Sequence, residues 1–310
     1  MSEPTASRMA TPGTRTDYFE IDSAAVGGRF AISVALPRGY GRDGTDPPLV
    51  YATDGNLVAP LADALRGGLV DDQAATRVEP YVQVSIGYTA EDAARQLILR
   101  NRDLVPPGEE VPGFMADHAR DRLGAGASES AVEDFLAAQR GARADAFLAF
   151  VEDELHPEIS RRYRFRGDDV GLFGFSYGGL FTLYALTAGS RLFSRFGACS
   201  PGVVVPDSRI YGLYDTLRSR PAEAERHLHL TVNAYEMFGP VRLYRHLAIE
   251  VLRLYDLLCE RPLPGLRVTT ELLAGEAHAT GLADAYRSFL RTCYPADRAV
   301  AEDGNPDRSR

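Results

Sequence analysis

The most informative stretch of the sequence is Asp169-Val-Gly-Leu-Phe-Gly-Phe-Ser-Tyr-Gly-Gly-Leu-Phe181, which contains a Gly-x-Ser-x-Gly pattern at 174–178. The apolar run 170–173 indicates a short buried strand, and 177–187 is typical of a helix. A serine on a tight turn from strand to helix has a strained backbone, and glycines two residues away on either side leave room for it. The pattern therefore predicts that Ser176 is exposed above a sheet, as a catalytic nucleophile must be.

Strand-like and helix-like segments alternate through the rest of the chain, which predicts an α/β fold with a mostly parallel central sheet flanked by helices. We expect strands at 18–22, 29–36, 49–53, 81–86, 170–173, 196–199, 229–232 and 266–273. We expect helices at 57–70, 144–159, 177–187 and 282–293, and one that opens at Pro240.

One domain is expected over 17–295, with flexible segments at 1–16 and 296–310. The least regular region is about 104–143, where Pro106, Pro107 and Pro112 interrupt the early part and a small-residue run at 124–128 interrupts the later part. A long irregular stretch inside a domain is typical of a lid or of a mobile surface insertion. We therefore predict a lid-like insertion here, with a surface insertion as the alternative.

The composition excludes several functions. The chain has 310 residues and a formal net charge of −9, so it lacks the positive field that binds nucleic acid. All 34 basic residues are arginine, which excludes catalysis by a lysine amine. No run resembles a signal peptide or a membrane span, so we expect a cytoplasmic protein. The widely spaced Cys199, Cys259 and Cys293 match no metal or redox motif and are expected to be reduced and mostly buried.

A serine hydroxyl needs a base to remove its proton, and the expected chain order is Ser, then Asp or Glu, then His after the last strand. His278 is the histidine that lies between the last predicted strand and the last predicted helix. His227 and His229 could share one face of a strand as a metal pair, but no pattern of carboxylates or cysteines completes such a site. We predict His278 as the base, and no metal or organic cofactor.

The acid that orients the histidine is predicted to be Glu236, which follows the strand 229–232 in an apparently irregular loop at 233–240. Asp207 is the alternative, and a Ser-His dyad without an acid is the third possibility. The developing oxyanion also needs donors, and the backbone N–H of Tyr177 is one. The second is expected from the loop after an early strand, where Asp54-Gly55-Asn56 stands.

With these residues identified, the chain resembles the putative-esterase branch of the α/β-hydrolases, which includes the trilactone siderophore esterases. The resemblance covers about 17–294 and rests on Tyr51–Asn56, Ile86–Tyr88, Arg100–Pro106, 141–163, Gly174–Phe181, Ser200-Pro201 and His278. The sequence departs from the branch at Asn233, where a glycine usually begins the Gly-x-x-Glu motif before the acid. The 104–143 segment is also individual to this chain, so the siderophore substrate class is not carried over.

The resemblance implies that Ser176 is the nucleophile, that His278 is the base, and that the Asn56 and Tyr177 amides bind the oxyanion. It places Arg100 and Arg102 in a basic motif near the active site and makes them, with Tyr88, candidate substrate contacts. The alternative for the arginines is a structural ion pair with Asp103 or a neighbouring carboxylate.

The predicted function is hydrolysis of a carboxylic ester, or of a lactone or thioester, through an acyl-enzyme intermediate. An acyltransferase with the same three residues is the alternative, because the acceptor depends on how dry the site is kept. A non-catalytic binding protein on the same fold is a further alternative that intact Ser176 and His278 disfavour. The expected partner is a small-molecule ester, and the sequence carries no signal of oligomeric state.

Overall fold

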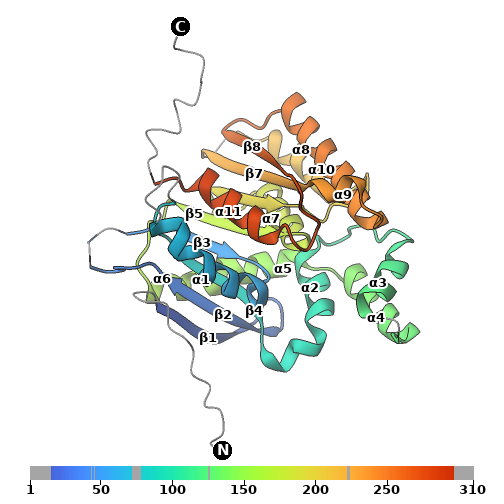
Figure 1. Cartoon of the computed structure of the whole chain (residues 1–310), viewed down its shortest axis with the longest axis horizontal. Helices are drawn as coiled ribbons and strands as arrows, with labels where there is room; N and C mark the ends of the chain where they lie inside the picture. Colours follow the sequence, from blue (N-terminus) through green and yellow to red (C-terminus); the bar gives the residue numbers. More distant parts are fainter. Residues whose placement is uncertain are drawn as a thin grey trace, which may run out of the picture.

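A twisted sheet runs through the centre of the computed structural model, which describes residues 15–42, 44, 46–71, 78–124, 126–221 and 224–296 (Figure 1). Its strands are β1 (Arg15–Ser23), β2 (Gly28–Leu36), β3 (Leu49–Ala52), β4 (Val82–Tyr88), β5 (Val170–Phe175), β6 (Arg195–Cys199), β7 (Arg226–Asn233) and β8 (Leu266–Leu273). Of the flexible segments predicted at 1–16 and 296–310, residues 1–14 and 297–310 lie outside the described residues. Arg15 and Thr16, predicted to be flexible, instead pair with β2.

The strand order is β1-β2-β4-β3-β5-β6-β7-β8. β1 and β2 are antiparallel to their neighbours, and every pairing from β4 to β8 is parallel. Parallel strands present their carboxyl ends at one edge of the sheet, where ligands bind in open α/β sheets. The predicted α/β fold with a mostly parallel sheet is confirmed.

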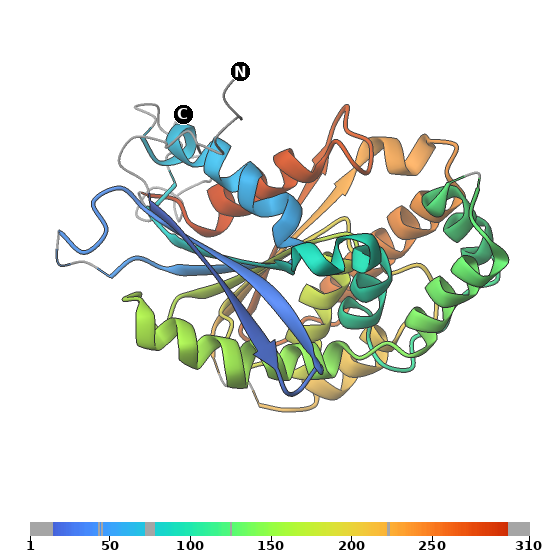
Figure 2. The same cartoon turned by 90° about the horizontal axis from the view of Figure 1, so that it is seen from below.

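Helices cover both faces of the sheet. Figure 2 shows α1 (Gly55–Asp71) and α11 (Leu282–Cys293) on one face and the long helix formed by α5 (Ala144–Ala149) and α6 (His156–Arg162) on the other. A π-helical segment, Phe150–Leu155, joins α5 to α6. Side chains of alternate strand residues enter the two cores, as the strand period requires: Leu172 belongs to the core on the α5–α6 side, and Phe173 to the core beneath α1 and α11. α7 (Tyr177–Ala188), α8 (Arg209–Arg218) and α10 (Arg242–Glu260) contribute to the first of these cores.

The segment 104–143 is not irregular, and that part of the prediction is wrong. After α2 (Gln96–Leu104), it forms α3 (Met115–Leu123) and α4 (Glu129–Arg140), which pack against each other at one end of the sheet (Figures 1 and 2). Gly124 ends α3 with a φ of 93°, and the Ser128 hydroxyl accepts a hydrogen bond from the Ala131 N–H to cap α4. The small residues at 124–128 therefore separate two helices. None of the helices in the described residues is both long and apolar enough to cross a membrane.

His227 and His229 lie on one face of β7, as predicted, but hydrogen bonds explain them without a metal. Their rings share the Thr269 hydroxyl, at 2.9 Å from each, and His229 also contacts the Ser288 hydroxyl at 2.7 Å. Within the described residues no group of three metal-ligating side chains occurs. Cys199, Cys259 and Cys293 are free, and all but Cys259 are buried, as expected.

The fit of α11 on the sheet predicts the effect of adding one methyl group to β6. A Cβ at Gly197 would lie 2.5 Å from the buried Phe289 ring, whereas a Cβ at Gly68 in α1 would contact nothing within 4 Å. We expect Gly197→Ala to lower the free energy of unfolding by about 1–3 kcal/mol through overpacking. Gly68→Ala is the matched control and should raise it by up to about 1 kcal/mol through helix propensity. Urea unfolding measures both, and an unaffected Gly197→Ala protein would contradict this packing.

The buried histidine pair predicts a loss of stability in acid. Burial lowers the pKa of His229 from 6.5 to about 4. Because the unfolded chain then binds a proton that the folded chain does not, the free energy of unfolding falls as the pH drops from about 6.5 to about 4. Replacing His229 with Gln should make this fall shallower in urea titrations at several pH values, and His246→Gln is the matched single-histidine control. An unchanged pH slope in His229→Gln would be the contrary result.

Candidate active site

Ser176 lies on the sharp turn between β5 and α7, with a φ of 59° and a ψ of −121°. The turn can form because its neighbours have no side chains: a Cβ at Gly174 would overlap the Gly178 carbonyl, and one at Gly178 would overlap the Thr53 hydroxyl. The Ser176 N–H donates to the Cys199 carbonyl at 3.0 Å, which fixes the turn to the end of β6. The serine is thus held at the carboxyl edge of the sheet, on the amino end of a twelve-residue helix.

His278 lies in the loop after β8 and is held by a carboxylate and two rings. Its Nδ1 lies 2.6 Å from Glu236 Oε1. The Tyr244 ring of α10 stacks on the imidazole, with centroids 4.2 Å apart and an interplanar angle of 20°, and the Phe175 ring packs at 5.0 Å. Because Nδ1 faces the carboxylate, Nε2 is the nitrogen left for proton transfer.

Glu236 is 1% exposed, and its carboxylate is well supplied with hydrogen-bond donors. Oε1 accepts from the Asn233 side-chain amide at 2.8 Å, and Oε2 accepts from the Asn233 N–H at 3.1 Å and from the Ser200 hydroxyl at 3.0 Å. Burying a carboxylate is costly unless its oxygens are hydrogen-bonded, and these donors offset that cost. The asparagine that replaces the usual glycine therefore supplies two of the bonds that hold the acid.

The loop predicted at 233–240 is in part a short helix, α9 (Ala234–Phe238), so its description as irregular is wrong. Asn233 is the N-cap and Glu236 is the third helical residue, the pair of positions that forms a capping box. The sequence contained this signal as an Asn followed three residues later by a Glu. Asp207, the alternative acid, is exposed on the turn before α8, whereas the carboxylate that binds His278 is that of Glu236.

The backbone amides of Asn56 and Tyr177 both belong to the first turn of a helix, where N–H groups have no acceptor within the helix. Two hydrogen bonds between the Asn56 side-chain amide and the Tyr88 backbone, at 2.8 and 2.9 Å, hold the β3–α1 turn against the end of β4. Glycine at 87 permits this approach, since a Cβ there would lie 2.5 Å from Asn56 Oδ1. Asn56 and Tyr177 therefore lie in the first turns of the helices that follow β3 and β5, which are neighbouring strands of the sheet.

Arg100 joins the two turns. Its guanidinium binds the Asp54 carboxylate through two hydrogen bonds of 2.5 and 2.9 Å and donates to the Phe175 carbonyl at 3.0 Å. Asp54 precedes the Asn56 turn, and Phe175 precedes Ser176. Arg100 lines the cavity described below, but its charge is already paired, so the structure favours the ion-pair alternative over a substrate contact.

Arg102 and Tyr88 do not line the cavity, so the structure does not place them as substrate contacts. The Arg102 guanidinium binds Asp103 at 2.6 Å, and the Tyr88 hydroxyl donates to the same carboxylate at 3.2 Å. Arg100 and Arg102 are two residues apart on α2, and side chains at that spacing leave a helix in different directions. Tyr88 contributes through its backbone bonds to Asn56 instead.

A cavity of about 450 Å³ opens above Ser176 and His278. Thirteen of its 22 lining residues are apolar or aromatic: Leu57, Ala93, Ala94, Leu97, Phe135, Phe175, Tyr177, Val204, Leu243, Tyr244, Leu247, Ala279 and Leu282. His118 and Arg122 of α3 and Phe135 of α4 reach it from the predicted lid-like insertion. Burial and the charges of Arg122 and His278 lower the pKa of His118 to about 4. No hydrogen bond joins Ser176 to His278 within the described residues, although both line this cavity.

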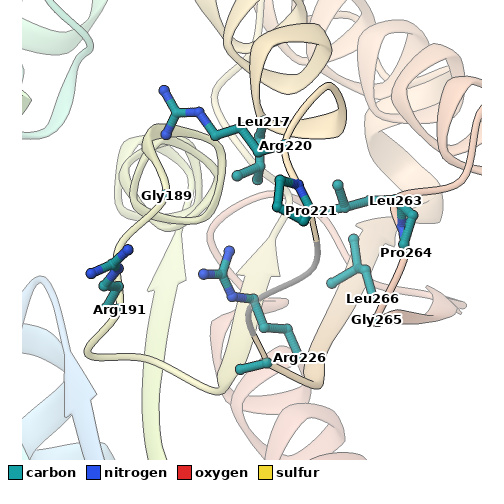
Figure 3. A pocket seen from close by; sticks show the side chains of 11 residues that line it. Gly189, Arg191, Leu217, Arg220, Pro221, Arg226, Leu263, Pro264, Gly265 and Leu266 are labelled. Carbon is teal, nitrogen blue, oxygen red and sulfur yellow. The ribbon is translucent and has the colours of Figure 1, made fainter.

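Another pocket, of about 70 Å³, lies at the opposite edge of the sheet, where β7 and β8 begin (Figure 3). It is lined by three arginines, Arg191, Arg220 and Arg226, and by apolar residues such as Leu217 and Leu266. Arg191 and Arg226 already have partners in the structure. The pocket is small and remote from Ser176, so the candidate active site is the larger cavity.

Tyr244, His118 and Arg122 are among the residues of the cavity wall that sequence reasoning missed. Tyr244 lies in the helix expected to open at Pro240, and no spacing shows that it stacks on a histidine thirty-four positions later. His118 and Arg122 are four residues apart, which places them on one face of a helix. Recognition of α3 would have been the signal for that pair.

Comparisons with solved structures show the same fold. The BES protein from Bacillus cereus is 20% identical, with a TM-score of 0.72 over 95% of this chain and 99% of that one. The siderophore hydrolase EstB from Aspergillus nidulans is 21% identical, with a TM-score of 0.71 over 94% of this chain and 98% of that one. An IroE-like serine hydrolase from Shewanella oneidensis has a TM-score of 0.70 at 20% identity, over 89% and 79% of the two chains.

The sequence comparisons are more specific. The chain is 30% identical over 170 residues to the ferri-bacillibactin esterase BesA of Bacillus subtilis (strain 168), which is 54% of this chain and 49% of that protein. The chain thus matches about half the length of this relative. The family described as "Putative esterase" matches residues 23–236. These residues include Ser176 and Glu236, and the family match covers more than half of the chain. The chain belongs to the esterase family that the sequence resemblance indicated.

Proposed function

We propose that the chain is a serine esterase that cleaves a small-molecule carboxylic ester through an acyl-enzyme on Ser176. The observation that carries this proposal is that the strained serine and a histidine bound to a buried carboxylate line one cavity. Membership of the esterase family supports ester hydrolysis, as do the names of two relatives, a siderophore hydrolase and a ferri-bacillibactin esterase.

In the proposed mechanism the substrate carbonyl lies between Ser176 and the amides of Asn56 and Tyr177. His278 Nε2 takes the serine proton as Oγ attacks the carbonyl carbon, and Glu236 stabilises the imidazolium that forms. The two amides donate to the oxyanion of the tetrahedral intermediate. His278 then protonates the leaving alcohol, and a water activated in the same way releases the acid.

The lining of the cavity supports an ester whose acyl or alcohol part is largely apolar. Asp54 and Arg100 both line the cavity and neutralise each other, so their ion pair adds no net charge to its wall. Arg122 lines the cavity from the exposed end of α3. An apolar group that enters this space gains about 25 cal/mol for each Å² removed from water. A panel of chromogenic esters should therefore show activity that rises with the apolar surface of the acyl group.

A fluorophosphonate probe tests the nucleophile. We expect the probe to label Ser176 in the wild-type protein, because an activated serine attacks phosphorus as it attacks a carbonyl. Ser176→Ala should lose both labelling and ester hydrolysis. Ser219→Ala removes an exposed hydroxyl on α8's C-terminal side and is the matched control, which should be labelled like the wild type. A wild-type protein that resists the probe would refute the serine mechanism.

A second pair of variants tests the acid. Glu236→Gln keeps the shape of the side chain but removes the charge that stabilises the imidazolium. The expected loss in kcat is on the order of 10⁴-fold, the cost of the equivalent change in a Ser-His-Asp enzyme. Asp207→Asn, at the exposed alternative position, should retain full activity. Steady-state kinetics on one chromogenic ester measures both, and the reverse order of effects would assign the acid to Asp207.

A further inference from the structure

The edge strand β8 carries the features of an interface with a second copy of this chain. It pairs with β7 on one side over all eight of its residues, and it is the last strand of the sheet (Figure 1). Among its residues Arg267, Thr270, Glu271 and Leu272 are exposed, and Leu272 is 54% exposed. An unpaired edge presents free N–H and C=O groups that can pair with another strand.

The two edge strands of the sheet differ in the charged side chains that oppose pairing with another strand. β1, at the other edge, carries four charged residues within nine, Arg15, Asp17, Glu20 and Asp22, and charged side chains on an edge strand oppose pairing with another strand. β8 carries only Arg267 and Glu271, which have opposite signs and lie four residues apart. Neither charge of β8 has an ion-pair partner within the described residues.

Backbone geometry limits how β8 can pair with itself. The N–H and C=O groups of alternate residues point outward, so in an antiparallel pair each outward residue must face an outward residue of the other strand. For two identical strands related by a two-fold axis, the axis then passes through a residue and not between two residues. Axes at Thr269 and at Thr270 give the longest overlap of β8 with its copy.

Only the axis at Thr269 pairs opposite charges. It places Arg267 of each copy directly opposite Glu271 of the other, on the same face of the sheet. The axis at Thr270 places Arg267 opposite Leu273 and Thr269 opposite Glu271. We infer that two copies of this chain associate through β8, antiparallel and centred on Thr269, to form one continuous sheet.

The surfaces beside β8 fit this arrangement. On one side, Ile249, Leu252 and Tyr255 form an exposed apolar stripe along α10, with 60%, 45% and 41% exposure, and Tyr255 lies within hydrogen-bond reach of Thr270. A second copy would cover this stripe together with Leu272. On the other side, an open groove of about 460 Å³ between β8 and α11 is lined by charges of both signs, of which Asp284 and Arg287 pair with each other at 3.0 Å.

The inference is independent of the proposed esterase activity, and a charge swap tests it. Analytical ultracentrifugation of the full chain should give a dimer with twice the 33.8 kDa mass of one chain. Arg267→Glu or Glu271→Arg alone places two pairs of like charges across the axis, so each should raise the dimer dissociation constant at least 10-fold. The double variant R267E/E271R restores two opposite-charge pairs and should restore the dimer. Glu20→Arg, a charge reversal on β1, is the matched control and should remain dimeric.

The contrary results are equally definite. A wild-type chain that stays monomeric at all concentrations overturns the inference. If Arg267→Glu and Glu271→Arg alone remain dimeric, the interface lies elsewhere on the chain. A folded double variant that stays monomeric, with a wild-type circular dichroism spectrum and melting temperature, rules out the register.

Cysteine cross-linking tests the axis without altering a charge. In a Cys259→Ser background, Thr269→Cys faces its own copy across the axis, at the 4.5–5.5 Å Cβ spacing typical of directly opposed residues, so mild oxidation should give a covalent dimer. Thr270→Cys faces residue 268 of the copy and should cross-link far less. A reversed preference moves the axis to Thr270 and overturns the Arg267–Glu271 pairing.

Discussion

Three neighbouring parallel strands each end at a residue that is not glycine but has a left-handed backbone. These residues are Asp54 after β3, Ser176 after β5 and Ser200 after β6, with φ values of 55°, 59° and 39°, and they are the only such residues in the described chain. Each such conformation costs about 1–3 kcal/mol and persists only where its surroundings impose it. Each also turns a side chain to the edge of the sheet: Asp54 toward Arg100, Ser176 toward the cavity and Ser200 toward Glu236. The candidate site is the place where these three turns meet.

The sequence allowed the fold to be predicted for segments whose apolar pattern arises from packing within the sheet or against it. The last strand, 266–273, and the last helix, 282–293, have the predicted bounds. In the helix, amphipathic spacing continues to the end, with Tyr286, Phe289 and Cys293 buried on one face. The helices α3, α4 and α9 were missed because proline and glycine near their ends dominate a prediction from composition. The caps of two of them, Ser128 for α4 and Asn233 for α9, were the better guide, since a cap marks a helix start even where the helix has few apolar residues.

Chain order and residue chemistry were enough to predict Ser176, His278 and Glu236 as one group, because a strand-end loop has few positions from which a side chain can reach its neighbour. The sequence could not show which charges neutralise each other. Arg100 pairs with Asp54, forty-six positions away, while Arg102 pairs with its immediate neighbour Asp103. The closeness of Arg100 and Arg102 in the sequence suggested one role for both, but their side chains leave α2 in different directions.

The place of β8 in the strand order also affects the position of His278. Only four residues separate its last residue, Leu273, from His278. Asn233, opposite Leu273 on β7, supplies two hydrogen bonds to Glu236. The register of the edge strand therefore sets the distance between the histidine and its acid. Elements with few neighbours open most readily, and β8 has a strand on one side only. Pairing with a second copy would hold that strand on both sides, so the proposed interface would also stabilise the position of His278.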